Sequence, residues 1–467
     1  SRGLGDVYKR QIDAVIIERF LQEIAENVIK TEEILKVTES RRTSKWYNRY
    51  AYLYDGLYYI AKMQEFHYAH ITGFHFGTEK ELWDSYCKEL YWMDTYYRRL
   101  HMDFRKSLFN TLGTLDDLFK SAVVTAEHLY QNWYLSELNG SWNSLIKESV
   151  ADGFSQNGIL QQDDFYRRVV QPIARESRVF VIISDALRYE VATELTEKLL
   201  RETNGTAKQS AMQSVFPSIT KFGMAALLPH KALTITDSMK MFCDEMPTDG
   251  TENRDKILKK TNPKNCAVTY ETLLTMKQAQ RRELVSGADV VYIYHNTIDA
   301  VGDKANTEHQ VFEACADALE ELKNLVRLIV NSMSGSKILI TADHGFLYAH
   351  EPLTESEKVS TSLVSGNVLE SGRRYLLANN ACQSESLMRV SMEKYANGLV
   401  GFTPFEAIRF QKQGGGSHFV HGGVSLQECC VPVITFKNIS KTSKKFVEIK
   451  KVPVKLISMT CLLYTSP

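Results

Sequence analysis

The sequence has no hydrophobic run that approaches the roughly 20 residues needed to cross a bilayer, so we expect no membrane-spanning segment. It also has no Cys-x-x-Cys pair. Its eight cysteines are irregularly spaced, which argues against a disulfide framework and favours reduced thiols in a cytoplasmic protein. Neither sign of charge dominates, because 56 Lys and Arg balance 56 Asp and Glu. This balance argues against a globally basic nucleic-acid-binding protein and against an acidic, disordered one.

The two ends of the sequence are poor guides to targeting. The chain opens without a methionine, and its first eleven residues, SRGLGDVYKRQ, resemble translated adaptor sequence, as do the last seven, CLLYTSP. We leave both out of the fold predictions and expect the chain to be a fragment of a longer protein. With 467 residues, 44% of them hydrophobic, it can form two or three domains with a sizeable core.

The stretch VFVIISDALRYEVATELTEKL, residues 179–199, organises the rest of the chain. Five apolar residues, Val179 to Ile183, lead into a polar Ser-Asp pair and then into a helical pattern. A continuous apolar run of this length is typical of a strand that is buried on both faces of a parallel sheet. Asp185 would then lie at the carboxyl end of the strand, where open α/β sheets bind their ligands.

The sequence predicts three regions. Residues 12–150 have helical periodicity, and residues 165–435 alternate between strands and helices. The predicted strands cover 179–183, a short stretch ending near 216, 289–295 and 337–341, and the predicted helices cover 187–201, 220–228, 271–285 and 308–331. Strands separated by helices indicate an α/β fold with a doubly wound, largely parallel sheet. We expect the polar residues 230–265 to be an insertion or cap and residues 436–460 to begin a truncated β-rich segment.

One stretch of the helical region, YWMDTYYRRLHMDF, interleaves aromatic residues with arginines. Such a pattern can stack on and clamp nucleic acid. It is equally the pattern of an amphipathic helical bundle with tyrosines at its solvent border, which is the interpretation we favour.

Three predicted strands are each followed by an acid or a histidine: Asp185, then His295 and Asp299, then Asp343 and His344. A single aspartate at such a position is more often a helix cap or a loop anchor. Because parallel strands end at one edge of a sheet, these residues can converge there. Crowded carboxylates repel one another unless a cation lies between them, so the pattern favours a metal site.

Three other residues point to the same edge. Thr220 in FPSIT opens a predicted helix, where a hydroxyl faces free backbone N–H groups and can act as a nucleophile; alone, it would be read as a helix cap. Asp303 lies four residues after Asp299 across a glycine, a spacing that lets both face one ion. His421 is flanked by glycines in a predicted tight loop, whereas His418 is a weaker candidate.

The motifs SDALRYE, FPSIT, DAVGD, TADHG and HGGVSLQE, in this order, resemble the alkaline phosphatase superfamily. More closely, VFVIISDALRYEVATEL and YHNTIDAVGDKANTEHQVFEA resemble the PglZ domain of bacterial BREX phage-defence systems, over about residues 178–435. This resemblance implies a metal-dependent phosphatase or phosphodiesterase, with nuclease activity included. Its substrate would be a phosphate ester, with nucleic acid or a nucleotide as candidates, and its partners would be other BREX proteins.

The resemblance also implies roles for individual residues. Asp185, Asp343 and His344 would hold one divalent ion beside the nucleophile Thr220, and Asp299, Asp303 and His421 would hold a second. Superfamily members often carry histidine where this chain has Asp303; zinc is still expected first, with manganese or magnesium as alternatives. Arg188 would steady a phosphate or form a surface salt bridge. Thr220 would attack phosphorus in line, and water would release the phosphothreonine.

Two other interpretations remain open at this point. The first is a non-catalytic scaffold of the defence complex that keeps the fold and binds partner proteins. The second is an enzyme similar to phosphoglycerate mutases or sulfatases, although sulfatases use cysteine or serine where this chain has Thr220. The retained set of carboxylates favours an enzyme over a scaffold, and residues 230–265 are expected to contribute to the choice of substrate.

Overall fold

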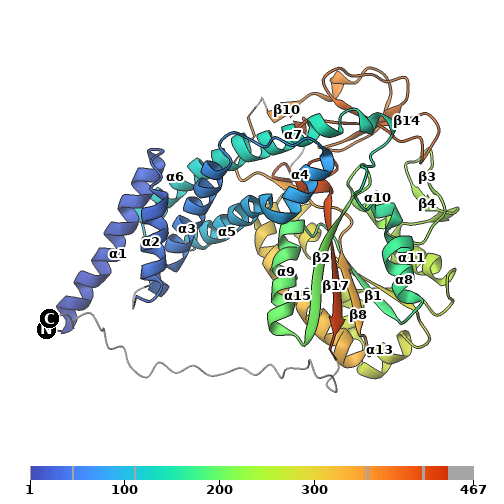
Figure 1. Ribbon diagram of the computed structural model, residues 1–467, viewed down its shortest axis with the longest axis horizontal. Helices are drawn as coiled ribbons and strands as arrows, with labels where there is room; N and C mark the ends of the chain where they lie inside the picture. The colour runs from blue at the N-terminus through green and yellow to red at the C-terminus, as the bar shows by residue number, and fades with distance from the viewer. Residues whose placement is uncertain are drawn as a thin grey trace.

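The computed structural model describes residues 2–44, 47–109, 112–351, 353–354, 357–412 and 416–439 of the 467-residue chain. A region of long helices comes first, and a layered α/β region follows it (Figure 1). In Figure 1 the helices drawn in blue and cyan extend away from one side of the sheet. Among the described residues, none of the helices is long and apolar enough to cross a membrane.

The helical region contains seven α-helices and two π-helical turns within the described residues. They are α1 (Arg2–Ala25), α2 (Thr31–Arg41), α3 (Tyr47–Ala69), α4 (Glu79–Ser85), η1 (Tyr86–Leu90), α5 (Trp92–Ser107), α6 (Thr114–His128), η2 (Leu129–Leu135) and α7 (Ser136–Ile146). Aromatic side chains fill much of the core between them; the rings of Tyr97 and Tyr130, for example, stack 3.7 Å apart. An aromatic-rich helical bundle is therefore the fold of this region.

Arginines of α5 attach the helical region to the α/β region. Arg98 is 1% exposed and binds Glu190 and Glu194 of α9 (Tyr189–Glu202). Arg99 binds Glu194 as well, at 2.6 Å. Because Tyr97 and Arg98 are buried against the rest of the protein, they are not available to clamp nucleic acid. The structure thus favours the bundle interpretation of the aromatic and arginine pattern.

A six-stranded sheet forms the centre of the α/β region, in the order β2-β17-β8-β1-β7-β6. Its strands are β1 (Val179–Ser184), β2 (Gly205–Gln213), β6 (Cys266–Thr269), β7 (Val290–His295), β8 (Lys337–Thr341) and β17 (Cys430–Asn438). The pairs β8–β1, β1–β7 and β7–β6 are parallel, whereas β17 is antiparallel to both of its neighbours. Every residue of β1 and β7 is buried, as expected for strands covered on both faces.

Helices cover both faces of this sheet, which confirms the doubly wound, largely parallel fold. On one side lie α9 and α15 (Val311–Ser332), and on the other lie α8 (Gln171–Ala174), α10 (Thr220–Ala226) and α11 (Gly250–Lys259) (Figure 1). Residues 230–265, predicted as an insertion or cap, fold into α11 and a three-stranded sheet of β3 (Leu233–Ile235), β4 (Met241–Cys243) and β5 (Met246–Pro247).

Three details differ from the sequence predictions. The helix expected over 271–285 is two helices, α12 (Tyr270–Thr275) and α13 (Gln278–Leu284), because the backbone is extended at Met276. The strand expected to end near 216 ends at Gln213 and pairs with β17. At the expected start of the β-rich segment over 436–460, Phe436 to Asn438 complete β17 of the central sheet. Residues 440–460 lie outside the described residues.

A second sheet was not predicted at all. It has four antiparallel strands in the order β11 (Val368–Ser371), β12 (Leu376–Asn379), β14 (Leu399–Thr403) and β13 (Met388–Ser391). Two further pairs flank it: β9 (Leu347–Tyr348) with β16 (Phe419–Val420), and β10 (Lys358–Val359) with β15 (Arg409–Phe410). These strands are short and separated by long loops, which weakens their period-two signal.

Candidate active site

The carboxyl ends of β1, β7 and β8 meet at one edge of the central sheet. Their parallel register sets Ser184 beside His295 and Ile183 beside Thr341. Asp185 and Asp343 follow these strand ends, and Asp185 donates its backbone N–H to the carbonyl oxygen of His295 at 2.9 Å. Residues that are far apart in the sequence therefore emerge together, as the strand pattern predicts.

Backbone N–H groups donate hydrogen bonds to only some of the carboxylate oxygens of Asp185 and Asp343. Ala186 has a left-handed conformation (φ 60°) and donates its N–H to Oδ1 of Asp343 at 3.2 Å, and the His344 N–H donates to the same oxygen at 3.0 Å. Across the described part of the chain, Oδ2 of Asp343 and Oδ1 of Asp185 have no hydrogen-bond partner although both are buried. A buried, unpartnered carboxylate oxygen is costly unless a cation binds it.

His344 presents a lone pair to these orphaned oxygens. Its Nδ1–H donates to the carbonyl oxygen of Gly345 at 2.8 Å, which leaves Nε2 unprotonated in the neutral ring. Nε2 lies 3.6 Å from Oδ1 of Asp185 and 3.4 Å from Oδ2 of Asp343. Burial lowers the pKa of His344 to about 3, so the ring stays neutral at neutral pH. Lone pairs that converge on one point in this way are the arrangement of a metal site.

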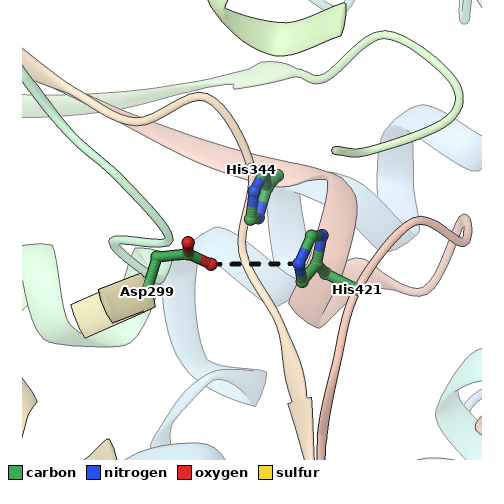
Figure 2. Close-up of side chains that lie close together, drawn as sticks. All are labelled: Asp299, His344 and His421. Carbon is green, nitrogen blue, oxygen red and sulfur yellow. Dashed lines mark ion pairs between the residues drawn. The ribbon is translucent and has the colours of Figure 1, made fainter. Parts of the chain in front are cut away.

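A second group lies next to the first (Figure 2). Asp299 of α14 (Ile298–Gly302) points toward His421, with its Oδ1 3.8 Å from the Nε2 of that ring. The rings of His344 and His421 are stacked 4.0 Å apart and nearly parallel. Each of the two groups, Asp185–Asp343–His344 and Asp299–His344–His421, has ligand atoms within 4.8 Å of one another. His344 belongs to both, whereas the sequence analysis assigned it to one.

The acids at this edge hold their protons more tightly than usual. Burial raises the pKa of Asp185 well above its ordinary value, and the nearby carboxylates of Asp343 and Asp299 raise it further. Burial likewise raises the pKa of Asp343 and of Asp299. The buried carboxylates, the neutral imidazole of His344 and the ring of His421 fit a divalent cation, because its charge would replace the protons on the acids and bind the unpartnered oxygens.

Thr220, the predicted nucleophile, is the first residue of α10 and lies beside the metal-ligand groups. Its hydroxyl contacts Nε2 of His344 at 3.2 Å. Gly223 allows this approach, because a Cβ at this position would lie 2.4 Å from the carbonyl oxygen of Asp343. The glycine of FPSITKFGM therefore lets α10 pack directly on the strand end that carries Asp343.

Asp303 is near the site but outside both metal-ligand groups. It is exposed at the end of α14, and its N–H donates to the carbonyl oxygen of Asp299 at 2.9 Å. It lines a cavity of about 450 Å³ together with Thr220 and His421. The structure thus brings the other predicted ligands together and leaves Asp303 at the rim of the cavity.

The expectation for Arg188 is wrong. Its side chain is 1% exposed, so it is neither a surface residue nor open to a substrate phosphate. The guanidinium lies 2.9 Å from Oδ1 of the fully buried Asp94 in α5 and 3.7 Å from Glu190, over the ring of Phe346. Arg188 therefore connects the loop after β1 to the helical region.

Two histidines near the strand ends serve other contacts. His295 is buried and hydrogen-bonds through Nδ1 to Ser184 and through Nε2 to Glu321, so it lies outside the metal-ligand groups. His418 contacts the carbonyl oxygen of Ala349 at 2.7 Å through its Nδ1. Both are structural residues in the described part of the chain.

Sequence analysis missed the residues that fix the His421 loop. Glu428 is completely buried and binds Arg374 through two guanidinium nitrogens, while it accepts the Gly423 N–H at 2.8 Å. Ser218 donates its hydroxyl to the Gly423 carbonyl oxygen at 2.7 Å. The capping-box pattern Ser-x-x-Glu of SLQE indicates the local role of Glu428. No local pattern indicates Arg374, which comes from the unpredicted second sheet.

A doubly wound sheet that gathers carboxylates, imidazoles and a hydroxyl at its carboxyl edge is the arrangement expected of an alkaline-phosphatase-like protein. Residues 165–436 match the family model described as "BREX system PglZ alkaline phosphatase-like domain". The chain belongs to this family, as its motifs indicate.

Two curated relatives match over most of this chain. The alkaline phosphatase-like protein BrxZ of Escherichia coli O9:H4 (strain HS) is 36% identical over 446 residues, which cover 92% of this chain and 51% of the relative. The alkaline phosphatase-like protein PglZ of Bacillus cereus (strain H3081.97) is 35% identical over 453 residues, 96% of this chain and 52% of the relative. The chain thus spans about half the length of these relatives.

Among solved structures, murine ectonucleotide pyrophosphatase/phosphodiesterase 5 aligns with this protein. The alignment covers 56% of this chain and 88% of the murine chain. The TM-score is 0.39 and the sequence identity is 11%. A likeness this distant does not bear on the chemistry of the site.

Proposed function

We propose that this protein is a metal-dependent phosphohydrolase, a phosphatase or phosphodiesterase that acts within a BREX defence system. One observation carries the proposal: unpartnered oxygens of Asp185 and Asp343 lie within 3.6 Å of Nε2 of His344, which contacts the Thr220 hydroxyl. The unpartnered Oδ1 of Asp299 lies 3.8 Å from the neighbouring His421. Membership of the PglZ family supports the BREX context and other BREX proteins as partners. A nucleic acid or nucleotide is a candidate for the phosphate ester substrate.

The chain offers ligands for two divalent ions. Asp185, Asp343 and His344 would hold one, and Asp299 and His421, with His344 beside them and Asp303 at the rim, would hold the other. The mixed oxygen and nitrogen donors favour zinc, with manganese or magnesium as alternatives. When bound, the ions neutralise phosphoryl charge, stabilise the leaving oxygen and lower the pKa of a coordinated hydroxyl.

The residues of the chain then perform four tasks. The Thr220 oxygen would lose its proton and attack the phosphorus atom in line, while the ester P–O bond breaks and the alcohol leaves with a proton. Water would then break the bond between Thr220 and phosphorus, which releases the phosphate product and restores the hydroxyl. Gly345 fixes the His344 tautomer through its carbonyl oxygen and keeps Nε2 directed at the acids. Ser218 and Glu428 hold the loop that carries His421. Ala186 orients Asp343 through its backbone N–H.

The test measures hydrolysis of 4-nitrophenyl phosphate, bis(4-nitrophenyl) phosphate and plasmid DNA, with zinc, manganese and magnesium each supplied to the purified protein. Thr220→Ala should abolish turnover, whereas Thr220→Ser should retain part of it because it keeps a hydroxyl. Thr234→Ala, at an exposed position of β3, is the matched control and should be fully active. Full activity of Thr220→Ala would disprove the covalent route.

Elemental analysis of the same preparations separates the enzyme from a scaffold. We expect bound transition metal in the wild-type protein and less of it in Asp343→Asn, whose buried oxygen faces the proposed ion. A wild-type protein that neither contains nor binds a divalent metal would favour the non-catalytic scaffold.

A further inference from the structure

A lysine lies next to the proposed nucleophile, on the wall of the cavity at the sheet edge. The cavity of about 450 Å³ is lined by Thr220, Asp303 and His421. Lys221, Glu370 and Tyr375 line the same cavity. The side chain of Lys221 is 32% exposed.

Two fixed partners hold the Lys221 ammonium group. It donates to the carbonyl oxygen of Met239 at 3.0 Å and forms an ion pair with Oε2 of Glu370. Met239 belongs to the β3–β4 turn, and Glu370 belongs to β11 of the second sheet. An ammonium group has three N–H donors, so one donor remains for a ligand in the cavity.

Glu370 is itself held in place from the side of the metal-ligand groups. Tyr375 donates its hydroxyl to Oε1 of Glu370 at 2.7 Å. The Tyr375 ring packs on Gly422, where an added Cβ would lie 2.5 Å from Cδ1 of the ring, and Gly422 follows His421 directly. The Lys221 charge is therefore fixed relative to both the nucleophile helix and the His421 loop.

We propose that Lys221 binds an anionic oxygen of the phosphoryl group on which Thr220 acts, and that Glu370 positions it. This inference rests on the proposed phosphohydrolase function. It assigns to Lys221 the role that the sequence analysis gave to Arg188, which the structure places in a buried ion pair. A fixed ammonium group strengthens binding of a phosphoryl dianion more than binding of a monoanion, because the attraction scales with charge.

The experiment compares Lys221→Met and Lys221→Arg with the wild type, all loaded with metal. Lys240→Met is the matched control, an exposed lysine of the same β3–β4 turn that does not line the cavity. Turnover of 4-nitrophenyl phosphate, a dianion at pH 8, and of bis(4-nitrophenyl) phosphate, a monoanion, gives kcat/KM for each variant. Calorimetric titration with inorganic phosphate measures binding without turnover.

For Lys221→Met we expect phosphate affinity to fall about tenfold to a hundredfold, the effect of losing one hydrogen bond from a charged donor. Its kcat/KM should fall more for the monoester than for the diester. Lys221→Arg should recover most of the loss, and Lys240→Met should match the wild type. An equal loss for both esters, or unchanged phosphate affinity in Lys221→Met, would overturn the inference.

The controls separate the two proposals. If the wild type hydrolyses neither ester yet binds phosphate in a manner that depends on Lys221, the proposed function fails and the phosphate-binding role of Lys221 alone stands. If the wild type is active and Lys221→Met is equally active, the inference fails and the proposed function stands. Glu370→Gln, which leaves the Lys221 charge unpaired and less constrained, should raise KM more than it lowers kcat.

Discussion

Removal of the Asp94 carboxylate should destabilise the protein strongly. Asp94 is fully buried in α5, where it accepts hydrogen bonds from Tyr86 at 2.8 Å and Tyr130 at 2.6 Å and lies 2.9 Å from the Arg188 guanidinium. In Asp94→Ala, Glu190, at 3.7 Å, would be the remaining ion-pair partner of Arg188 among the described residues. Breaking one side of a buried ion pair costs about 3–5 kcal/mol, which is the loss of unfolding free energy that we expect.

Guanidinium chloride unfolding, followed by circular dichroism, measures this loss. Asp84→Ala is the control, because Asp84 is 60% exposed and forms a surface pair with Lys80; its replacement should cost at most about 1 kcal/mol. In the double variant Asp94→Leu with Arg188→Met, no buried charge is left unpaired, so it should be more stable than Asp94→Ala. A loss below about 1 kcal/mol in Asp94→Ala would refute the argument that this ion pair joins the two regions.

Three further predictions concern the sheet edge and the helical contact. Gly223→Ala forces Cβ against Asp343, so we expect about 1–3 kcal/mol of destabilisation and weaker zinc binding by calorimetry. Asp185→Asn should make the metal-free protein more stable, because it removes one of three crowded carboxylates. Zinc at 100 times its Kd should stabilise the wild type by about 2.7 kcal/mol in thermal unfolding, and this gain should be lost in Asp185→Asn. Burial lowers the pKa of His350 to about 3, so the unfolded chain binds a proton there that the folded protein excludes. The neutral His350 ring therefore costs the folded protein no stability above about pH 6.5, and the free energy of unfolding falls as the pH drops from there toward 3. His350→Asn should reduce this fall, measured by thermal unfolding between pH 7 and pH 4.

The sequence predicts the central fold well because its signals are local. The apolar run from Val179 to Ile183 becomes β1 with every residue buried, and the acid after it lies at the sheet edge. The helical region likewise follows from periodicity. The second sheet escapes prediction because strands such as β11 and β13 are four residues long and pair only after loops bring them together. The place of strand β17 between β2 and β8 is also a tertiary outcome, because its own residues do not indicate which strands it pairs with.

The site is predictable to a similar extent. Asp185, Asp343 and His344 follow strands, so their convergence can be inferred from a parallel register. The prediction for Arg188 failed for a different reason. The sequence around residue 188 does not indicate which element packs against its side chain. Its partner Asp94 comes from a helix about ninety positions earlier, a contact that only the three-dimensional structure brings about.

The strongest argument for metal ions is the contrast between two buried carboxylates, Glu428 of α16 (Leu426–Cys429) and Asp343 after β8. Glu428 receives hydrogen bonds on both of its oxygens from Arg374 and from the loop backbone. Asp343, equally buried, receives two N–H donors on Oδ1 and, among the described residues, none on Oδ2. Hydrogen-bond donors are thus present near Asp343, so a lack of donors does not explain why its Oδ2 has no partner. The unpartnered oxygens of Asp185 and Asp343 lie within 3.6 Å of Nε2 of His344, which carries a lone pair and cannot donate to them, so a cation would satisfy these acids and the imidazole together.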